Sequence, residues 1–484
     1  MCKLRTLRPP QVWLTALAAF SLVSTASAQT LVCGNISGTW SSSGSPYIAT
    51  CDCTVPAGQT LTIQPGVVVE IGSGISITNN GLIQAVGTPS QRITFQAPVS
   101  SQYWNTIWNY GGGTNLFTYC DFQNAQTAIS MIAVAKTDGN NINMSVEILN
   151  CTFSNCIAQA VYGQAQGYAG SSCPFVFQAN ATLNPTIKNC TFTAMSNGCV
   201  MNISGQAAGP CSGDSAYGYG YAYPTLSANI FQNLTGSAFL MGAGSYAGAS
   251  SVTFLNNTIV ACVGGVNAAD PWNAQIQDNI FVGCTNAVMD SGSLSRQVSY
   301  NDFYRNATNF TGYATTYGQL IWTNRNGTPA DILYNIYSNP LFVATNDFHL
   351  TASSPCVNAG TPNSAFANMC IPNPSIATNF PDLGAYGGPD ACNWLDVVPK
   401  LPAQLSMSRS NNLVWLNWGA IPRSSYQVQY FATNLNATSG TNRWLTNTTL
   451  IPAAKPVSIA VSPYPTTNSK AFYRVRSLGR TPGN

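Results

Sequence analysis

NCTFSNCIAQAV at residues 150–161 and NCTFTAMSNGCV at residues 189–200 are two copies of the motif that decides the fold, Asn-x-x-Phe or Asn-x-x-Ile. The motif returns seven times between residues 119 and 310, and its anchors are Phe122, Phe153, Phe192, Phe231, Ile259, Phe281 and Phe303. The anchors are 31, 39, 39, 28, 22 and 22 residues apart. A motif that returns every ~20 to 50 residues is typical of stacked repeats, which bury a core only against their neighbours. We therefore expect rungs of 22 residues, with loops inserted into the longer intervals.

Short β-branched runs punctuated by Gly and Pro fill residues 46–95, for example TVPAGQTLTIQPGVVVEI at 54–71. Strands of three to five residues with such frequent turns favour a coil of β-strands over a sandwich. No segment keeps a 3.6-residue apolar period, so the expected fold class is all-β.

Stacked rungs place equivalent residues about 4.8 Å apart, so that they form columns. The column two positions before the anchors comprises Cys120, Cys151, Cys190, Asn229, Asn257, Asn279 and Asn301. Stacked Asn side chains can hydrogen-bond along such a column and satisfy backbone groups of the turns. Three positions after the anchors an apolar column contains Cys262 and Cys284. Parallel stacked side chains suit a disulfide poorly, which favours free thiols there.

These motifs resemble those of the right-handed parallel β-helix proteins, the pectate-lyase-like superfamily. TVPAGQTLTIQPGVVVEIGSG is similar to their first coils, and NPLF at 339, DFHL at 347, SPCVNAG at 354 and DLGAYGG at 382 are similar to their last coils. The resemblance implies a right-handed parallel β-helix over residues 29–392. It does not select an activity, because lyases, hydrolases, tailspikes and adhesins share this fold.

Residues 393–402 have the composition of a linker, and residues 403–484 alternate apolar and polar side chains in several short runs. This pattern predicts a small antiparallel sandwich. The runs YQVQY at 426 and FYRVR at 472 resemble a fibronectin type III module of the kind that ends exported proteins of environmental bacteria.

Residues 1–28 have the features of a secretory signal peptide: a basic start, an apolar stretch and Ala26-Ser27-Ala28 as cleavage site. No later stretch is long and apolar enough to span a bilayer. We expect a secreted protein, either extracellular or at the cell surface. Loss of three basic residues with the signal leaves 15 basic and 15 acidic residues, a balance that argues against nucleic acid as a partner.

The charges are unevenly distributed between the two parts of the chain. Residues 403–484 hold eight basic and no acidic residues, whereas residues 29–402 hold seven basic and fifteen acidic ones. The basic module suits docking to an anionic glycan or cell surface, and equally suits packing against the acidic coil.

Asp270 and Asp290 lie at similar places in consecutive repeats, with Trp272 near the first of them. Two stacked carboxylates suit Ca²⁺ binding, or a division of acid and base roles at about 5 to 10 Å, and a Trp can stack on a sugar ring. The alternative is that these are turn aspartates bonded to their own backbone. His349, the only histidine, lies in the DFHL strand and is expected to be structural. No cofactor is otherwise indicated.

Tyrosines are concentrated in the loops that lengthen the repeats: Tyr162, Tyr168, Tyr217, Tyr219, Tyr221, Tyr223 and Tyr246. All fall between equivalent rung positions, so we expect a tyrosine-rich shelf on one side. A flat apolar ring with a hydrogen-bonding tip suits neutral glycans, although such loops can also pack on each other.

The sequence therefore favours recognition of extracellular polysaccharide, with Tyr217, Tyr219, Tyr221, Tyr223 and Trp272 as ligand-binding residues. A polysaccharide lyase or glycoside hydrolase that uses Asp270 and Asp290 is the second reading. A structural surface or adhesion protein is the third.

Overall fold

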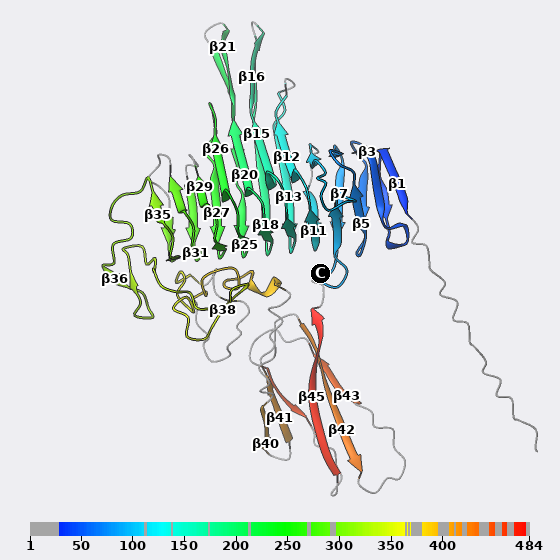
Figure 1. Cartoon of the computed structure of the whole chain (residues 1–484), viewed down its shortest axis with the longest axis vertical. Coiled ribbons are helices and arrows are strands. Elements are labelled where there is room, and N and C mark those ends of the chain that lie inside the picture. Colours follow the sequence, from blue (N-terminus) through cyan, green and yellow to red (C-terminus); the bar gives the residue numbers. More distant parts are fainter. Residues whose placement is uncertain are drawn as a thin grey trace, which may run out of the picture.

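The computed structural model describes residues 29–394, apart from 111–113, 137–138, 173–174, 212–213, 269–272, 291–296, 364, 366–367 and 369–379, and the strands between residues 406 and 480. The described residues form an all-β structure whose main part is a parallel β-helix (Figure 1). Short 3-10 turns among the described residues include η1 (Ser42–Gly44) and η3 (Ala391–Asn393).

The coil has three faces, each a ladder of parallel strands. Face 1 is an 11-stranded sheet. Its strands are β2 (Gly38–Trp40), β4 (Thr60–Ile63), β7 (Leu82–Val86), β10 (Thr114–Thr118), β13 (Ile142–Leu149), β18 (Ala181–Lys188), β23 (Gly220–Ala222), β24 (Thr225–Ser227), β27 (Ser251–Leu255), β30 (Asn273–Gln277) and β33 (Gln297–Ser299).

Faces 2 and 3 belong to one 20-stranded sheet that starts with β1 (Thr30–Asn35) and β3 (Tyr47–Val55). Face 2 consists of β5 (Val68–Ile71), β8 (Ile93–Gln96), β11 (Cys120–Gln123), β14 (Thr152–Ser154), β19 (Thr191–Thr193), β25 (Ile230–Gln232), β28 (Thr258–Val260), β31 (Ile280–Val282) and β34 (Asp302–Tyr304). Face 3 consists of β6 (Ile77–Asn79), β9 (Ile107–Asn109), β12 (Thr127–Val134), β15 (Gln159–Gln166), β20 (Asn197–Ser204), β26 (Ser237–Ala243), β29 (Gly264–Ala268), β32 (Asn286–Asp290) and β35 (Thr308–Thr311).

The repeat anchors stack along face 2 in the register that their spacing predicts. Phe122 pairs with Phe153, Phe153 with Phe192, and Phe281 with Phe303. Ring centroids in these three pairs are 4.8, 5.0 and 5.0 Å apart, with nearly parallel planes. Because every anchor is almost fully buried, this column forms a continuous part of the core.

The column two positions before the anchors is a hydrogen-bonded ladder. Asn257 Nδ2 donates to Asn279 Oδ1 at 3.0 Å and to the Leu226 carbonyl at 3.1 Å. Its own Oδ1 accepts from the backbone N and Nδ2 of Asn229, both at 3.0 Å. All four hydrogen-bonding positions of this buried amide are therefore satisfied.

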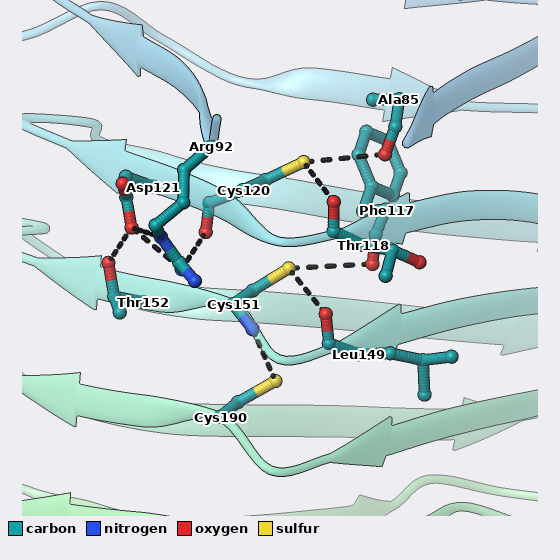
Figure 2. A network of polar contacts seen from close by, with 10 residues as sticks. All are labelled: Ala85, Arg92, Phe117, Thr118, Cys120, Asp121, Leu149, Cys151, Thr152 and Cys190. Atoms are coloured by element: carbon teal, nitrogen blue, oxygen red, sulfur yellow. Dashed lines mark hydrogen bonds and ion pairs between the residues drawn. The ribbon is translucent and has the colours of Figure 1, made fainter. Parts of the chain in front are cut away.

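Cysteines continue the same column toward the N-terminus (Figure 2). Cys120 Sγ donates to the Ala85 carbonyl, Cys151 Sγ donates to the Phe117 carbonyl, and Cys151 N donates to Cys190 Sγ. Cys262 and Cys284 are also buried free thiols, as expected from their parallel stacking. The described residues contain one disulfide, Cys33–Cys51, in the first coil.

The two 39-residue intervals each contain an antiparallel hairpin that projects beyond the coil (Figure 1). One consists of β16 (Tyr168–Ser172) and β17 (Phe175–Ala179), the other of β21 (Gln206–Cys211) and β22 (Asp214–Gly218). The prediction of inserted loops is thus confirmed, and the loops are hairpins.

After face 3 ends, the chain forms two small hairpins and then runs back along one edge of the coil. The hairpins are β36 (Trp322–Thr323) with β37 (Pro329–Ala330), and β38 (Phe342–Ala344) with β39 (Asp347–Leu350). Residues 380–394, which we call the strap, contact the corner turns between faces 1 and 2: Gly384 N donates to the Asp278 carbonyl, and Asn189 Nδ2 donates to the Asp390 carbonyl.

Residues 406–480 contain two three-stranded antiparallel sheets. One has β40 (Ser406–Ser410), β41 (Leu413–Trp418) and β44 (Val457–Val461). The other has β43 (Leu445–Leu450), β42 (Ser424–Asn434) and β45 (Ser469–Arg480).

Candidate functional site

Four tyrosines form a row where the second hairpin returns to face 1. Tyr217, Tyr219, Tyr221 and Tyr223 have successive ring centroids 6.4, 6.2 and 6.4 Å apart. This spacing follows from the strand, in which alternate residues lie on one side and are about 6.6 Å apart. Tyr217 and Tyr223 are 42% and 39% exposed, and Tyr219 and Tyr221 are partly exposed. We call these four residues the tyrosine row.

Small residues between the tyrosines explain why the rings all face outward. The intervening positions are Gly218, Gly220 and Ala222, and all three are buried. A Cβ at Gly218 would lie 2.1 Å from the Tyr168 carbonyl oxygen, and one at Gly220 would lie 2.3 Å from the Ala165 carbonyl oxygen. The strand therefore passes directly over neighbouring backbone, and only glycine permits that approach.

Neighbouring groups hold the row in place. Tyr223 Oη donates to the Ala249 carbonyl at 3.1 Å, and the Tyr221 ring lies against Gly248. Tyr246, 45% exposed, extends the row at its outer end, with its ring centroid 5.8 Å from that of Tyr217. Burial, together with the neighbouring hydroxyls of Tyr223 and Tyr219, raises the pKa of Tyr221 above its usual value.

One of the expected shelf residues lies elsewhere, and another is less exposed than the row. Tyr162 is in β15 on face 3, where its hydroxyl accepts a hydrogen bond from Asn202 Nδ2. Tyr168 is partly buried and packs against the core. The expectation that all the repeat-lengthening tyrosines share one side is therefore wrong for Tyr162, because this residue belongs to a ladder strand and not to an insertion.

The outward-facing positions of the tyrosine row continue along the chain into a groove, which the sequence did not predict. Thr225 and Ser227 follow Tyr223 at the same alternate positions, and both line a hollow beside the strap. Lys188 and Asp390 line this hollow and an adjoining one of about 360 Å³. The alternation of outward and inward side chains over residues 217–227 could have predicted the direction of the row. It could not have predicted that the strap lies there, because the strap is about 200 residues away in the sequence.

Asp390 connects the strap to the groove floor. Its carboxylate lies 3.2 Å from Lys188 Nζ and accepts a 2.7 Å hydrogen bond from Ser227 Oγ. Glu147 lines the larger hollow and is in register with Thr186 of the neighbouring strand. The groove therefore contains two carboxylates, one ammonium group and several hydroxyl and amide groups.

The structure describes only one member of the predicted acidic pair, Asp290. Asp270 and Trp272 lie outside the described residues. Asp290 ends β32, is 8% exposed and is in register with Ala268. Among the described residues no group of three or more His, Cys, Asp or Glu side chains gathers where it could hold a metal ion.

His349 contacts residues of the closing segment. Its Nδ1 lies 2.5 Å from Asp347 Oδ1, and its ring stacks on Tyr386 with centroids 3.7 Å apart. The stacking on Tyr386 connects β39 to the strap.

No helix in the described part of the chain has the length and apolar character needed to cross a membrane. No protein-family model matches the chain. Over 55 residues, 11% of its length, the chain is 46% identical to Protein bark beetle of Drosophila melanogaster, and the match spans 2% of that protein. Because this match is so short, we infer a function from the structure of the parallel β-helix itself.

Proposed function

We propose that this protein is exported and binds polysaccharide along the tyrosine row. The observation that carries the proposal is the row itself, four partly exposed rings at regular 6.2–6.4 Å intervals on a strand that glycines fix in place. Aromatic faces with polar tips suit sugar rings, which have apolar faces and hydroxyl rims. A regular series of such rings suits a chain of repeating sugars better than a single small ligand.

The signal-like residues 1–28 support export of the protein, and the basic C-terminal module supports its attachment to a surface outside the cell. We infer that residues 403–484 form a fibronectin type III-like accessory module, in line with the two three-stranded sheets between residues 406 and 480. Its eight basic residues suit attachment to an anionic surface, which salt would weaken.

Affinity electrophoresis and a glycan array, with and without Ca²⁺, test the proposal on the mature chain. We expect retention by at least one polysaccharide without cleavage. The double variant Tyr219→Ala/Tyr221→Ala should reduce the affinity at least tenfold, since each lost stacking contact removes about 1 kcal/mol or more.

Tyr162→Ala is the matched control, because this tyrosine lies on face 3 and should leave binding unchanged. Release of shortened products, lost in Asp290→Ala, would instead identify a lyase or hydrolase. If the protein neither binds nor cleaves any glycan, a structural or adhesion role would be favoured.

A further inference from the structure

The tyrosine row ends at the groove beneath the strap, so a chain lying on the row would lead into it. Thr225 and Ser227 continue the outward alternation of Tyr221 and Tyr223 on the same stretch of face 1. Over the eight steps from residue 217 to residue 225 the path is roughly 26 Å long at about 3.3 Å per residue. The row and the groove are therefore two parts of one surface.

The groove is preformed by contacts between the strap and the coil. Asp390 is held from three sides, by Lys188 Nζ, by Ser227 Oγ and, through its backbone carbonyl, by Asn189 Nδ2. Farther along the strap, Ala385 N donates to Thr258 Oγ1 at 2.9 Å. The two adjoining hollows, about 360 and 180 Å³, together have the size of a small-ligand site.

The charges around this surface point to the class of ligand. Lys188 and Asp390 compensate each other as an ion pair, which leaves Glu147 as an additional negative charge. In β13, β18, β23, β24, β27 and β30, Glu147 and Lys188 are the only charged residues. An acidic sugar would therefore meet no uncompensated cation there and would be repelled by Glu147.

We propose that the groove lined by Glu147, Lys188 and Asp390 is the end subsite for an uncharged polysaccharide whose preceding sugars lie on the tyrosine row. This rests on the proposed function and adds its substrate class and a second contact region. Sugar hydroxyls donate to the carboxylates of Glu147 and Asp390, while Lys188 and the neighbouring amides donate to ring and hydroxyl oxygens. Hydrogen bonds to charged groups are roughly twice as strong as those between neutral groups.

Titration calorimetry with two sets of oligosaccharides of equal length tests this assignment. One set consists of neutral β-linked glucan, mannan and xylan fragments, and the other of oligogalacturonate and oligomannuronate. We expect at least one neutral fragment to bind and every acidic one to bind at least tenfold more weakly. Glu147→Gln should weaken neutral binding about tenfold by removing a charge-assisted hydrogen bond.

Glu70→Gln is the matched control, since Glu70 lies on face 2 and the substitution is the same. Glu147 makes no hydrogen bond or ion pair with the described residues of the strap, so its variant should keep the wild-type melting temperature. Asp390→Asn, which alters the contact with Lys188 and Ser227, serves as the second variant. If Tyr219→Ala weakens binding but neither Glu147→Gln nor Asp390→Asn does, the row is a binding site and the end subsite is wrong. Tighter binding of acidic fragments than of neutral ones would overturn the substrate class. Cleavage of a fragment would show that the groove is a catalytic site and not a binding subsite. If no fragment binds at all, the proposed function is wrong as well.

Discussion

Side-chain size at alternate positions determines how residues 217–223 present their rings. The outward positions are tyrosines, and the inward ones are Gly218, Gly220 and Ala222. The inward positions tolerate no larger side chain where the strand crosses other backbone. The row could be predicted as exposed aromatics from the sequence, whereas its position depends on this crossing, which only the folded hairpins create.

Gly220→Ala should displace the row, because the added methyl group would lie 2.3 Å from the Ala165 carbonyl oxygen. We expect weaker glycan binding, by tenfold or more, with a modest fall in melting temperature. Gly244→Ala is the control, since its Cβ meets its nearest neighbour, a Ser204 side-chain carbon, at 3.1 Å. Unchanged affinity in Gly220→Ala would show that the row does not need this close approach.

Asn279→Ala should strongly destabilise the coil. The substitution removes the acceptor of both Asn257 N and Asn257 Nδ2, and these donors are buried. Each unsatisfied buried donor costs about 1–3 kcal/mol, so we expect the free energy of unfolding to fall by about 3 kcal/mol. Urea unfolding measures this, with the exposed Asn143→Ala as control; equal effects of the two substitutions would contradict the ladder's role.

Among the elements, the ladder strands were the most predictable. Seven anchors at repeat spacing fixed the register of face 2, because stacking requires equivalent residues to pair. The hairpins within the long intervals were foreseen only as insertions. Their sequences contain no repeat, and β21 and β22 gain their partners only from each other. The end of the Asn column was also missed, since Asn335 and Asp331 lie in an irregular segment after the last repeat.

The stacked cysteines of the coil should resist alkylation in the native protein. Burial raises the pKa of Cys156 and Cys284 to about 12 and that of Cys53 to about 11, so that little reactive thiolate exists at neutral pH. We expect a charged alkylating reagent to leave Cys53, Cys156 and Cys284 unmodified until the chain unfolds. Peptide mass spectrometry before and after denaturation measures this, and rapid native labelling of Cys284 would contradict the packed core.

Across the whole molecule, the contacts that return the C-terminal segment to the coil could not be foreseen. Lys188 and Asp390 are 202 residues apart, and no local pattern links such positions. The DLGAYGG segment was expected in the last coil, and instead it crosses corner turns of earlier rungs. The strap therefore shapes the groove, and the described C-terminal segment is more than an end cap.

Buried carboxyl groups in and under the C-terminal segment that follows face 3 should make stability depend on pH. Burial raises the pKa of Asp278 to about 8 and of Asp302 to about 7, and raises that of Asp382 above its usual value. Between about pH 4 and pH 8 the folded state holds protons that the unfolded chain has released. The free energy of unfolding therefore falls as pH rises through this window, by up to about 1.4 kcal/mol per pH unit for each such group.

Urea unfolding at pH 5, 7 and 9 measures this dependence. Asp278→Asn should flatten the profile and stabilise the protein at pH 9, because a neutral amide replaces a carboxyl group whose Oδ2 has no hydrogen-bond partner. Glu70→Gln, at a partly exposed site, should leave the profile unchanged. Stability that rose from pH 5 to pH 9 would show that these groups are charged in the fold.

The Asn ladder gives the coil an electrical direction. Every amide from Asn229 to Asn301 donates toward the next rung, and Asn335 then donates to both carboxylate oxygens of Asp331. The aligned dipoles add up along the axis, as peptide dipoles do in an α-helix, and their positive end meets a carboxylate. Because a carboxylate accepts and does not donate, Asp331 ends the series. The column thus has a polarity and a terminus of its own, independent of the backbone that carries it.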